Sequence, residues 1–320
     1  MPNSPGSIVN KIAGIPFFGA PLPVPQFQGS PPVVGGFTTG NTWFVSSTHA
    51  NGADDTANGD TPLRPFDSIE YAIGRCTANN GDIIYVMPGH VETIPATDLN
   101  VDVAGIQIIG LGAGASRPQL NLTAAGSTIA VSVASVLFYN LLITGGIDAI
   151  TSVLTVTGAD FSVINCEYRD VTGQCAQFCA VSAAADRMLV NGFTYDGAAA
   201  AGTVAAFNLT GPDRFTLCNF IAEGNFSTSF GDITTTAAVN VHVYNGRFRT
   251  SHAADLFWVD TVTGSTGQFG PSLYLRLQDN AINITEAITG ATFVYHNDIS
   301  IVNLAGELGM LTNITASTDA

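Results

Sequence analysis

An asparagine that returns along the chain at almost constant intervals limits the possible folds more than any other feature of the sequence. It stands at five positions: Asn140, Asn165, Asn191, Asn219 and Asn245. The residue two positions earlier is apolar in every copy, and the pattern extends to Gly110 before the first copy and to Asn297 after the last. A fixed period of this length is the signature of a repeat architecture.

The chemistry of this position predicts a tight bend. Asparagine and glycine enter the left-handed region of backbone conformation at the lowest cost. A short β-rich stretch runs into each bend and another leaves it, as in 137–145 and 161–170. If every turn of about 26 residues bends at the same place, successive turns stack about 4.8 Å apart with parallel strands, and their asparagine amides can hydrogen-bond along the axis. The repeat therefore predicts a parallel β-helix, which is a solenoid.

An asparagine ladder at a tight turn resembles a recognised feature of the right-handed, pectate-lyase-like parallel β-helix superfamily. The resemblance covers roughly residues 41–303 and implies an all-β fold, a single right-handed parallel β-helix. The sequence adds to it an extended N-terminal arm and a short capping helix. It is a weak guide to activity, because this architecture hosts lyases, hydrolases, adhesins and viral structural proteins.

Residues 1–40 differ in composition from everything that follows. Eight of the fifteen prolines fall here, interleaved with large apolar residues that include Phe17, Phe18, Phe27 and Phe37. Proline at this density excludes helix and central strand, and leaves an extended chain. Two interpretations stay open: an arm that docks on a partner through these phenylalanines, which we prefer, and an arm folded back over its own β-helix.

The rest of the chain divides into three predicted parts. Residues 41–94 form the N-terminal cap and first coil, 95–303 form the β-helix body, and 304–320 form a C-terminal cap or tail. Within the body, the Gly/Ser/Thr-rich stretch 261–272 is expected to project as a loop, because insertions in solenoids usually do.

The predicted cap contains one short helix. An opening strand at 42–46 leads to a polar loop, and Asp67 or Ser68 can then cap a helix with one apolar face. That face consists of Ile69, Ala72 and Ile73. Such a helix would cover the first coil, whose open end would otherwise expose apolar core and strand edges.

The charge balance excludes several classes of partner. The chain has a formal net charge of -15, and its one lysine is Lys11. Without a basic patch it is not expected to bind nucleic acid or an anionic membrane, and no secretory signal or membrane-spanning run is expected. Charged residues make up only 11% of the chain, and a surface so poor in charge suits permanent assembly with other subunits.

No metal ion or cofactor is predicted. The five cysteines are odd in number and irregularly spaced, which argues for buried thiols and against a disulfide framework. Cys175 and Cys179 lack the second pair of ligands that a zinc site needs. Asp54, Asp55 and Asp60 could offer oxygen ligands to calcium, but a turn-rich connector explains them better.

Two carboxylates are the best candidates for catalysis. Asp170 and Asp196 each follow a ladder asparagine by five residues, so they could stand about 5 Å apart on adjacent coils, as in a retaining glycosidase. Glu223 shares its offset with Arg169 and Arg249, however, and an exposed ladder of charges explains the whole set equally well. We therefore predict no enzyme, and name Asp170, Asp196 and Glu223 as the acids if it is one.

A lyase would need a base, and the body contains no lysine. Arginine could serve, and Arg169, Arg247 and Arg249 are the residues to test. No matching group of acids is evident beside them in the sequence.

The functional hypothesis follows from these points together. The chain looks like the β-helical decoration, fibre or spike proteins of tailed bacteriophages: a non-enzymatic virion protein, assembled in the host cytoplasm. The expected partners are two further copies of itself in a homotrimer, the major capsid protein or another virion protein held by residues 1–40, and a host-surface glycan. Two alternatives remain: a tailspike or extracellular enzyme that degrades polysaccharide as a glycoside hydrolase or lyase, and an adhesin that binds glycans without cutting them.

Overall fold

The computed structural model describes residues 38–96, 98–145, 147–170, 175–197, 203–250, 256–276, 292–296, 299–302 and 308–310. Four phenylalanines of the predicted arm and the last ladder asparagine lie outside these residues: Phe17, Phe18, Phe27, Phe37 and Asn297. No helix within the described residues is long and apolar enough to cross a membrane.

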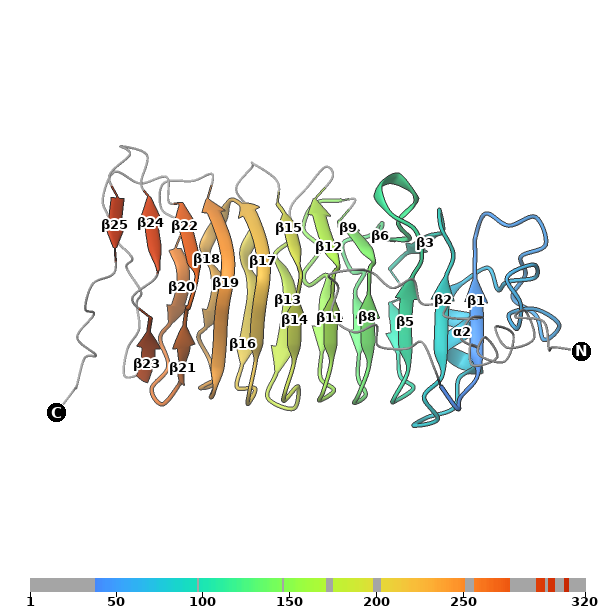
Figure 1. Ribbon diagram of the computed structural model, residues 1–320, viewed down its shortest axis with the longest axis horizontal. Helices are drawn as coiled ribbons and strands as arrows, with labels where there is room; N and C mark the ends of the chain where they lie inside the picture. The colour runs from blue at the N-terminus through green and yellow to red at the C-terminus, as the bar shows by residue number, and fades with distance from the viewer. Residues whose placement is uncertain are drawn as a thin grey trace, which may run out of the picture.

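The chain winds into a parallel β-solenoid with coils of about 26 residues, as the repeat predicts. Figure 1 shows the coils stacked in chain order from the N-terminal end to the C-terminal end. Between residues 83 and 260 each coil contributes strands to three faces, and on each face a strand pairs in parallel with the strands of neighbouring coils.

The strands of the first and second faces follow one another directly along the chain. The first face contains β1 (Thr42–Val45), β2 (Ile83–Val86), β5 (Gln107–Gly110), β8 (Leu137–Tyr139), β11 (Ser162–Ile164), β14 (Leu189–Asn191), β21 (Thr266–Phe269) and β23 (Thr292–Tyr295). The second face contains β3 (Val91–Ile94), β6 (Gln119–Leu122), β9 (Leu142–Gly145), β12 (Glu167–Asp170), β15 (Thr194–Asp196), β22 (Leu273–Arg276) and β24 (Ser300–Val302). Two long strands continue from one face onto the other: β17 (Thr216–Gly224) and β19 (Val241–Thr250).

The third face is a separate sheet. It contains β4 (Leu99–Val101), β7 (Ile129–Val131), β10 (Leu154–Val156), β13 (Gln177–Ser182), β16 (Thr203–Thr210), β18 (Phe226–Ile233) and β20 (Leu256–Asp260). A short 3-10 helix, η1, spans Gly114–Ser116, and β25 (Leu308–Met310) pairs antiparallel with β24 at the C-terminal end.

The N-terminal end carries the expected short helix, α2 (Ile69–Arg75), which contacts β1, β2 and β4. Ser68 is its N-cap, and its hydroxyl oxygen accepts a hydrogen bond from the Tyr71 N–H at 3.2 Å. Ile69, Ala72 and Ile73 are buried, so the helix presents its apolar face to the solenoid interior. The helix therefore covers apolar core that the open first coil would expose.

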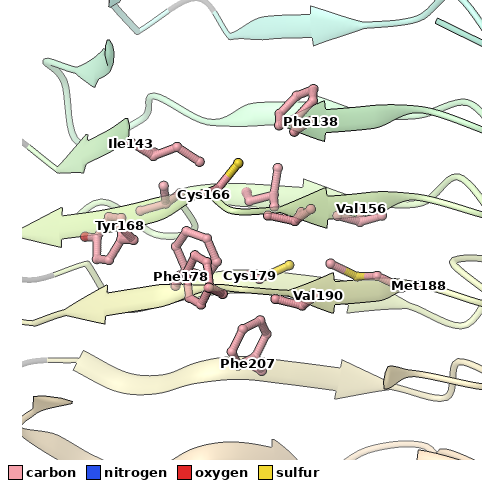
Figure 2. Packing of buried hydrophobic residues seen from close by; sticks show 14 of the residues in the cluster. Phe138, Ile143, Val156, Cys166, Tyr168, Phe178, Cys179, Met188, Val190 and Phe207 are labelled. Carbon is pink, nitrogen blue, oxygen red and sulfur yellow. The ribbon is translucent and has the colours of Figure 1, made fainter. Parts of the chain in front are cut away.

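The interior is filled by large side chains that stack from coil to coil (Figure 2). Tyr168 and Phe178 lie with ring centroids 4.9 Å apart, and Phe178 has the same spacing to Phe193 on the next coil. Each buried side chain of this size contributes about 1.5–3 kcal/mol of burial free energy. The core thus runs along the solenoid axis, and it is built from contacts between neighbouring coils.

All five cysteines are free thiols, and Cys166, Cys175, Cys179 and Cys218 are buried. Burial raises the pKa of Cys166 to about 11 and that of Cys175 to about 12. The thiolate, which is the reactive and metal-binding form, is therefore scarce at neutral pH. The interpretation as buried thiols is confirmed for these four, while Cys76 is half-buried.

The stretch 261–272 does not project as a loop, so that prediction is wrong. Its central part forms β21, which pairs with β19 on one side and β23 on the other. Phe269 points into the core, and a Cβ at Gly267 would lie 2.1 Å from the Val241 carbonyl oxygen. The glycine here allows two coils to approach closely, a need that composition cannot distinguish from a flexible loop.

Candidate functional site

The bend between the first and second faces is built around the asparagine column. Four of the asparagines have a left-handed backbone there: Asn140 (φ 56°), Asn165 (φ 53°), Asn219 (φ 53°) and Asn245 (φ 50°). In the following coil the same place is taken by Ser272 (φ 59°), which pairs with the Gly246 N–H through its carbonyl oxygen.

Asn191 does not occupy the bend, and its assignment there is wrong by one residue. It pairs with Ile164 and Cys218, which stand one position before the bend, and Gly192 takes the left-handed conformation (φ 68°). Glycine adopts this conformation as readily as asparagine, so an Asn-Gly pair leaves the register ambiguous in sequence. A Cβ at position 192 would lie 2.4 Å from the Asn165 side-chain oxygen, which explains the glycine.

Gly110 is likewise not left-handed, although it stands at the start of the column. A Cβ there would lie 2.3 Å from the Asn140 carbonyl oxygen. The glycine is required because two backbones approach closely, and not because of its φ angle. The Asn140 amide donates hydrogen bonds to the carbonyl oxygens of Gly110 and Gly112, at 2.9 and 3.0 Å.

The asparagine amides form a hydrogen-bonded ladder over three successive coils. The Asn219 amide donates to the Asn191 side-chain oxygen at 2.7 Å, and the Asn245 amide donates to the Asn219 side-chain oxygen. Asn191 therefore joins the ladder through its side chain although its backbone lies outside the bend. Asn165 donates instead to the Tyr139 hydroxyl, at 3.3 Å.

The register shift at Asn191 changes which charged residues meet on the second face. Asp196 lies directly opposite Arg169 and Glu223, and Glu223 lies opposite Arg249. We call Arg169, Asp196, Glu223 and Arg249 the charged column. Arg249 Nη1 is 2.9 Å from Glu223 Oε1, Arg169 Nε is 3.7 Å from Asp196 Oδ2, and all four side chains are about half exposed.

Asp170 is not part of this column. It pairs with Gly145, and its side chain accepts a hydrogen bond from the Tyr168 hydroxyl. Burial raises the pKa of Tyr168, and the charges of Cys175 and Asp170 add to the effect, so the phenol stays protonated and remains a donor. The predicted pairing of Asp170 with Asp196 at about 5 Å is therefore wrong.

The charged column has the chemistry of an exposed ion-pair ladder. Asp196 and Glu223 are neighbours on adjacent coils, at the strand spacing of about 4.8 Å. Each has an arginine on its other side, and both face water. A glycosidase needs one carboxyl that stays protonated, which apolar burial provides. Neither carboxylate has such surroundings, and no group of three or more metal-ligating side chains occurs among the described residues.

A shallow groove of about 410 Å³ runs beside the bend, next to the charged column. Its lining includes the ladder residues Asn219 and Asn245, together with Ile221, Arg247 and Tyr274. The Arg247 guanidinium lies 5.9 Å from the centroid of the Tyr274 ring. The sequence pattern indicated Asn219 and Asn245 as ladder residues and Arg247 as a candidate base, but it did not indicate the groove itself. Ile221 and Tyr274 have no local signal, because the groove is assembled from residues of successive coils.

A buried network near α2 has a structural explanation. His90 Nε2 lies 2.9 Å from Glu92 Oε2, and the same carboxylate oxygen accepts a hydrogen bond from the Ile69 N–H at the start of the helix. The Ser47 N–H donates to His90 Nδ1 at 2.9 Å, so the ring carries its proton on Nε2 and donates it to Glu92.

The N-terminal end of α2 also contacts the loop that contains Asp54, Asp55 and Asp60. Asp54 accepts hydrogen bonds from the N–H groups of Asp67 and Ser68, at 2.8 and 3.0 Å. These contacts tie the start of the capping helix to the loop that precedes it.

Neither a protein-family model nor a curated protein sequence matches the chain. A solved structure of a rhamnogalacturonan lyase is similar to it, with a TM-score of 0.40 and 13% sequence identity over 83% of this chain and 86% of the lyase chain. A similarity of this degree carries no information about activity, because one fold hosts many chemistries.

Proposed function

We propose that this chain is a non-enzymatic structural protein of a virus particle, of the decoration, fibre or spike type that tailed bacteriophages display. The proposal rests on the contacts that the side chains of the three candidate acids make. Asp170 is bound by Tyr168, Asp196 lies beside Arg169, and Glu223 is ion-paired with Arg249. Each is held by a neighbour, as expected of side chains that stabilise a surface.

The surface chemistry supports a role in assembly. Charged residues are only 11% of the chain, and aliphatic side chains stand exposed on the strands, including Val204, Ile221 and Val294. Burying such side chains in the interface of an oligomer is favourable, because it removes apolar surface from water. We propose a homotrimer bound to the major capsid protein or another virion protein, with a host-surface glycan as a further ligand.

Two measurements test this proposal. Light scattering on the purified full-length protein is expected to give three times the mass of one chain. Cryo-electron microscopy of the particles from the native source is expected to show the protein as a regular component of the virion. Monomeric protein found free outside cells, with none on particles, would contradict the proposal.

One observation favours a second function, the degradation of a polysaccharide. Asp196 and Glu223 are adjacent carboxylates on one face, and the groove beside them is lined by Tyr274 and Arg247. An aromatic ring next to polar groups can hold a sugar.

The test for this second function is the release of reducing ends or unsaturated uronate from capsular and pectic polysaccharides. Asp196→Asn and Glu223→Gln should each abolish release if it occurs, and Asp148→Asn, an exposed carboxylate elsewhere, should leave it unchanged. Release that depends on Asp196 or Glu223 would overturn the non-enzymatic proposal.

A further inference from the structure

Three of the nine arginines lie together on the outer surface of the second face. Arg247 and Arg249 are two positions apart on β19, so both point to the same side of the strand. Arg276, on the next strand β22, lies directly opposite Arg249, and Tyr274 lies opposite Arg247. All four residues are exposed. We call Arg247, Arg249 and Arg276 the arginine cluster.

Positive charge exceeds negative charge in this cluster. Glu223 forms an ion pair with Arg249 at 2.9 Å. Arg247 and Arg276 form no ion pair within the described part of the chain, whereas Arg169, farther along the charged column, contacts two carboxylates. Like charges that lie directly opposite each other destabilise a sheet, so the facing Arg249 and Arg276 are unfavourable until an anion binds near them. The cluster therefore attracts an anionic ligand.

The groove beside the bend shares Arg247 and Tyr274 with the arginine cluster. Its lining also includes the aliphatic side chain of Ile221 and the side chains of Asn219 and Asn245. A sugar ring has an apolar face of C–H groups and a rim of hydroxyl groups, so it fits a groove whose lining offers both apolar and polar groups. A sugar in contact with the Tyr274 ring would have its rim near the Arg247 guanidinium, which lies 5.9 Å from the ring centroid.

We propose that the groove and the arginine cluster together bind a glycan through one acidic sugar. Its ring contacts Tyr274, and its carboxylate or sulfate group contacts Arg247. The planar guanidinium binds such oxyanions through two parallel hydrogen bonds. The inference rests on the proposed host-surface glycan ligand, to which it assigns a site and a charge.

The charge of the whole chain limits which acidic glycans fit this site. The formal net charge is -15, so an extended polyanion is repelled by most of the surface. The arginine cluster covers only two adjacent strands, β19 and β22. It therefore suits a glycan in which acidic sugars are isolated among neutral ones, and not a chain of consecutive uronic acids.

NMR titrations of the full-length protein with three sugars test the proposal: glucuronic acid, glucose 6-sulfate and glucose. At least one acidic sugar is expected to bind about tenfold more tightly than glucose, because a hydrogen bond between charged groups adds about that factor. The acidic sugar that binds more tightly identifies the anionic group. This preference is expected to shrink as salt is added, since the arginines are exposed to water.

Variants of the exposed residues separate the contribution of charge from that of the ring. Arg247→Met keeps most of the aliphatic stem, and is expected to abolish the preference for acidic sugars while the affinity for glucose stays the same. Arg64→Met is the matched control, because it removes an exposed arginine of the N-terminal cap and changes the net charge equally. Tyr274→Ala is expected to weaken the binding of all three sugars.

The proposal is overturned if glucose binds as tightly as both acidic sugars, or if none of the three binds. It is also overturned if Arg64→Met weakens binding as much as Arg247→Met does. The melting temperature of each variant is expected to stay close to that of the wild type, since only exposed side chains change. The oligomeric mass and the location on virions are measured separately, so a failure of sugar binding is distinguishable from a failure of the structural role.

Discussion

The charged column on the second face has a counterpart on the first face that differs from it in almost every physical respect. This counterpart, which we call the outer apolar patch, is a cluster of buried residues outside the interior core: Ile83, Ile109, Leu137, Tyr139 and Ile164. Both consist of outward side chains on parallel strands of the same solenoid. Tyr139 in the patch is 4% exposed, whereas the Glu223 side chain in the charged column is 47% exposed. The alternation of a strand decides only the direction of a side chain. Whether a side chain that points outward is exposed to water depends on the groups that pack around it.

The largest difference in stability between the first and second faces is expected when one outward aliphatic residue on each is truncated to alanine. Leu137→Ala in the patch should lower the free energy of unfolding by about 2–3 kcal/mol, because it removes buried methyl groups and leaves a cavity. Ile221→Ala on the second face should change it by less than about 0.5 kcal/mol. Urea denaturation of both variants measures the difference. Equal effects would mean that the patch is no better covered than the second face.

The bend that joins the two faces should be the next most sensitive place. Gly192→Ala is expected to cost about 1–2 kcal/mol, because alanine resists the left-handed backbone and its methyl group meets the Asn165 side chain. Gly126→Ala is the matched control, since a Cβ there meets no atom within 4 Å and its φ is not in the left-handed region. Thermal melts compare the two. If Gly192→Ala left the melting temperature unchanged, the result would show that the bend tolerates a side chain.

A covered carboxylate on the third face extends the comparison to charge. Asp232 is 4% exposed, and burial raises its pKa, with the charge of Asp260 as the second cause. The stability linked to this group is complete below its ordinary pKa of 3.8, and is lost as the pH rises through the higher pKa of the folded state. Asp232→Asn should therefore stabilise the protein at pH 7 and have no effect near pH 3. Urea denaturation at both pH values tests the sign, and destabilisation at pH 7 would contradict it.

The smallest effect is expected in the charged column itself. Arg249→Met removes the partner of Glu223 and keeps most of the aliphatic stem. Because both side chains are about half exposed, solvent screening limits the loss to less than about 0.5 kcal/mol. Unfolding measured at low and high salt should show wild type and variant converging as the salt rises. A loss above 1 kcal/mol would show that the column contributes more than a surface ladder.

Much of the fold could be predicted from local chemistry. The recurring Asn positions and the strand pattern around them are enough for a parallel solenoid, because each coil obeys the same rule independently of the others. Ser68 as an N-cap followed by Ile69, Ala72 and Ile73 is likewise sufficient for the capping helix. The stretch 261–272 could not be interpreted in this way, since its glycine serves close packing between coils and not flexibility.

The candidate site was predicted less well, and the reason is register. The left-handed residue of this coil is Gly192 and not Asn191, so the strand that follows is shifted by one residue from the predicted register. As a result, Asp196 pairs with Arg169 and not with Asp170. Two residues that can both take the left-handed conformation stand side by side there, and the sequence contains no local signal that selects one of them.

The solenoid, its bend and the scarcity of charge can be derived from the amino-acid sequence alone, since they follow from the conformational preferences of single residues and from a count of side chains. The folded arrangement of the coils was needed to establish which charges face each other and which outward apolar residues are buried. Both depend on residues from different coils, about 26 positions apart. Contacts over such distances are set by pairing register and by packing, which no local preference specifies.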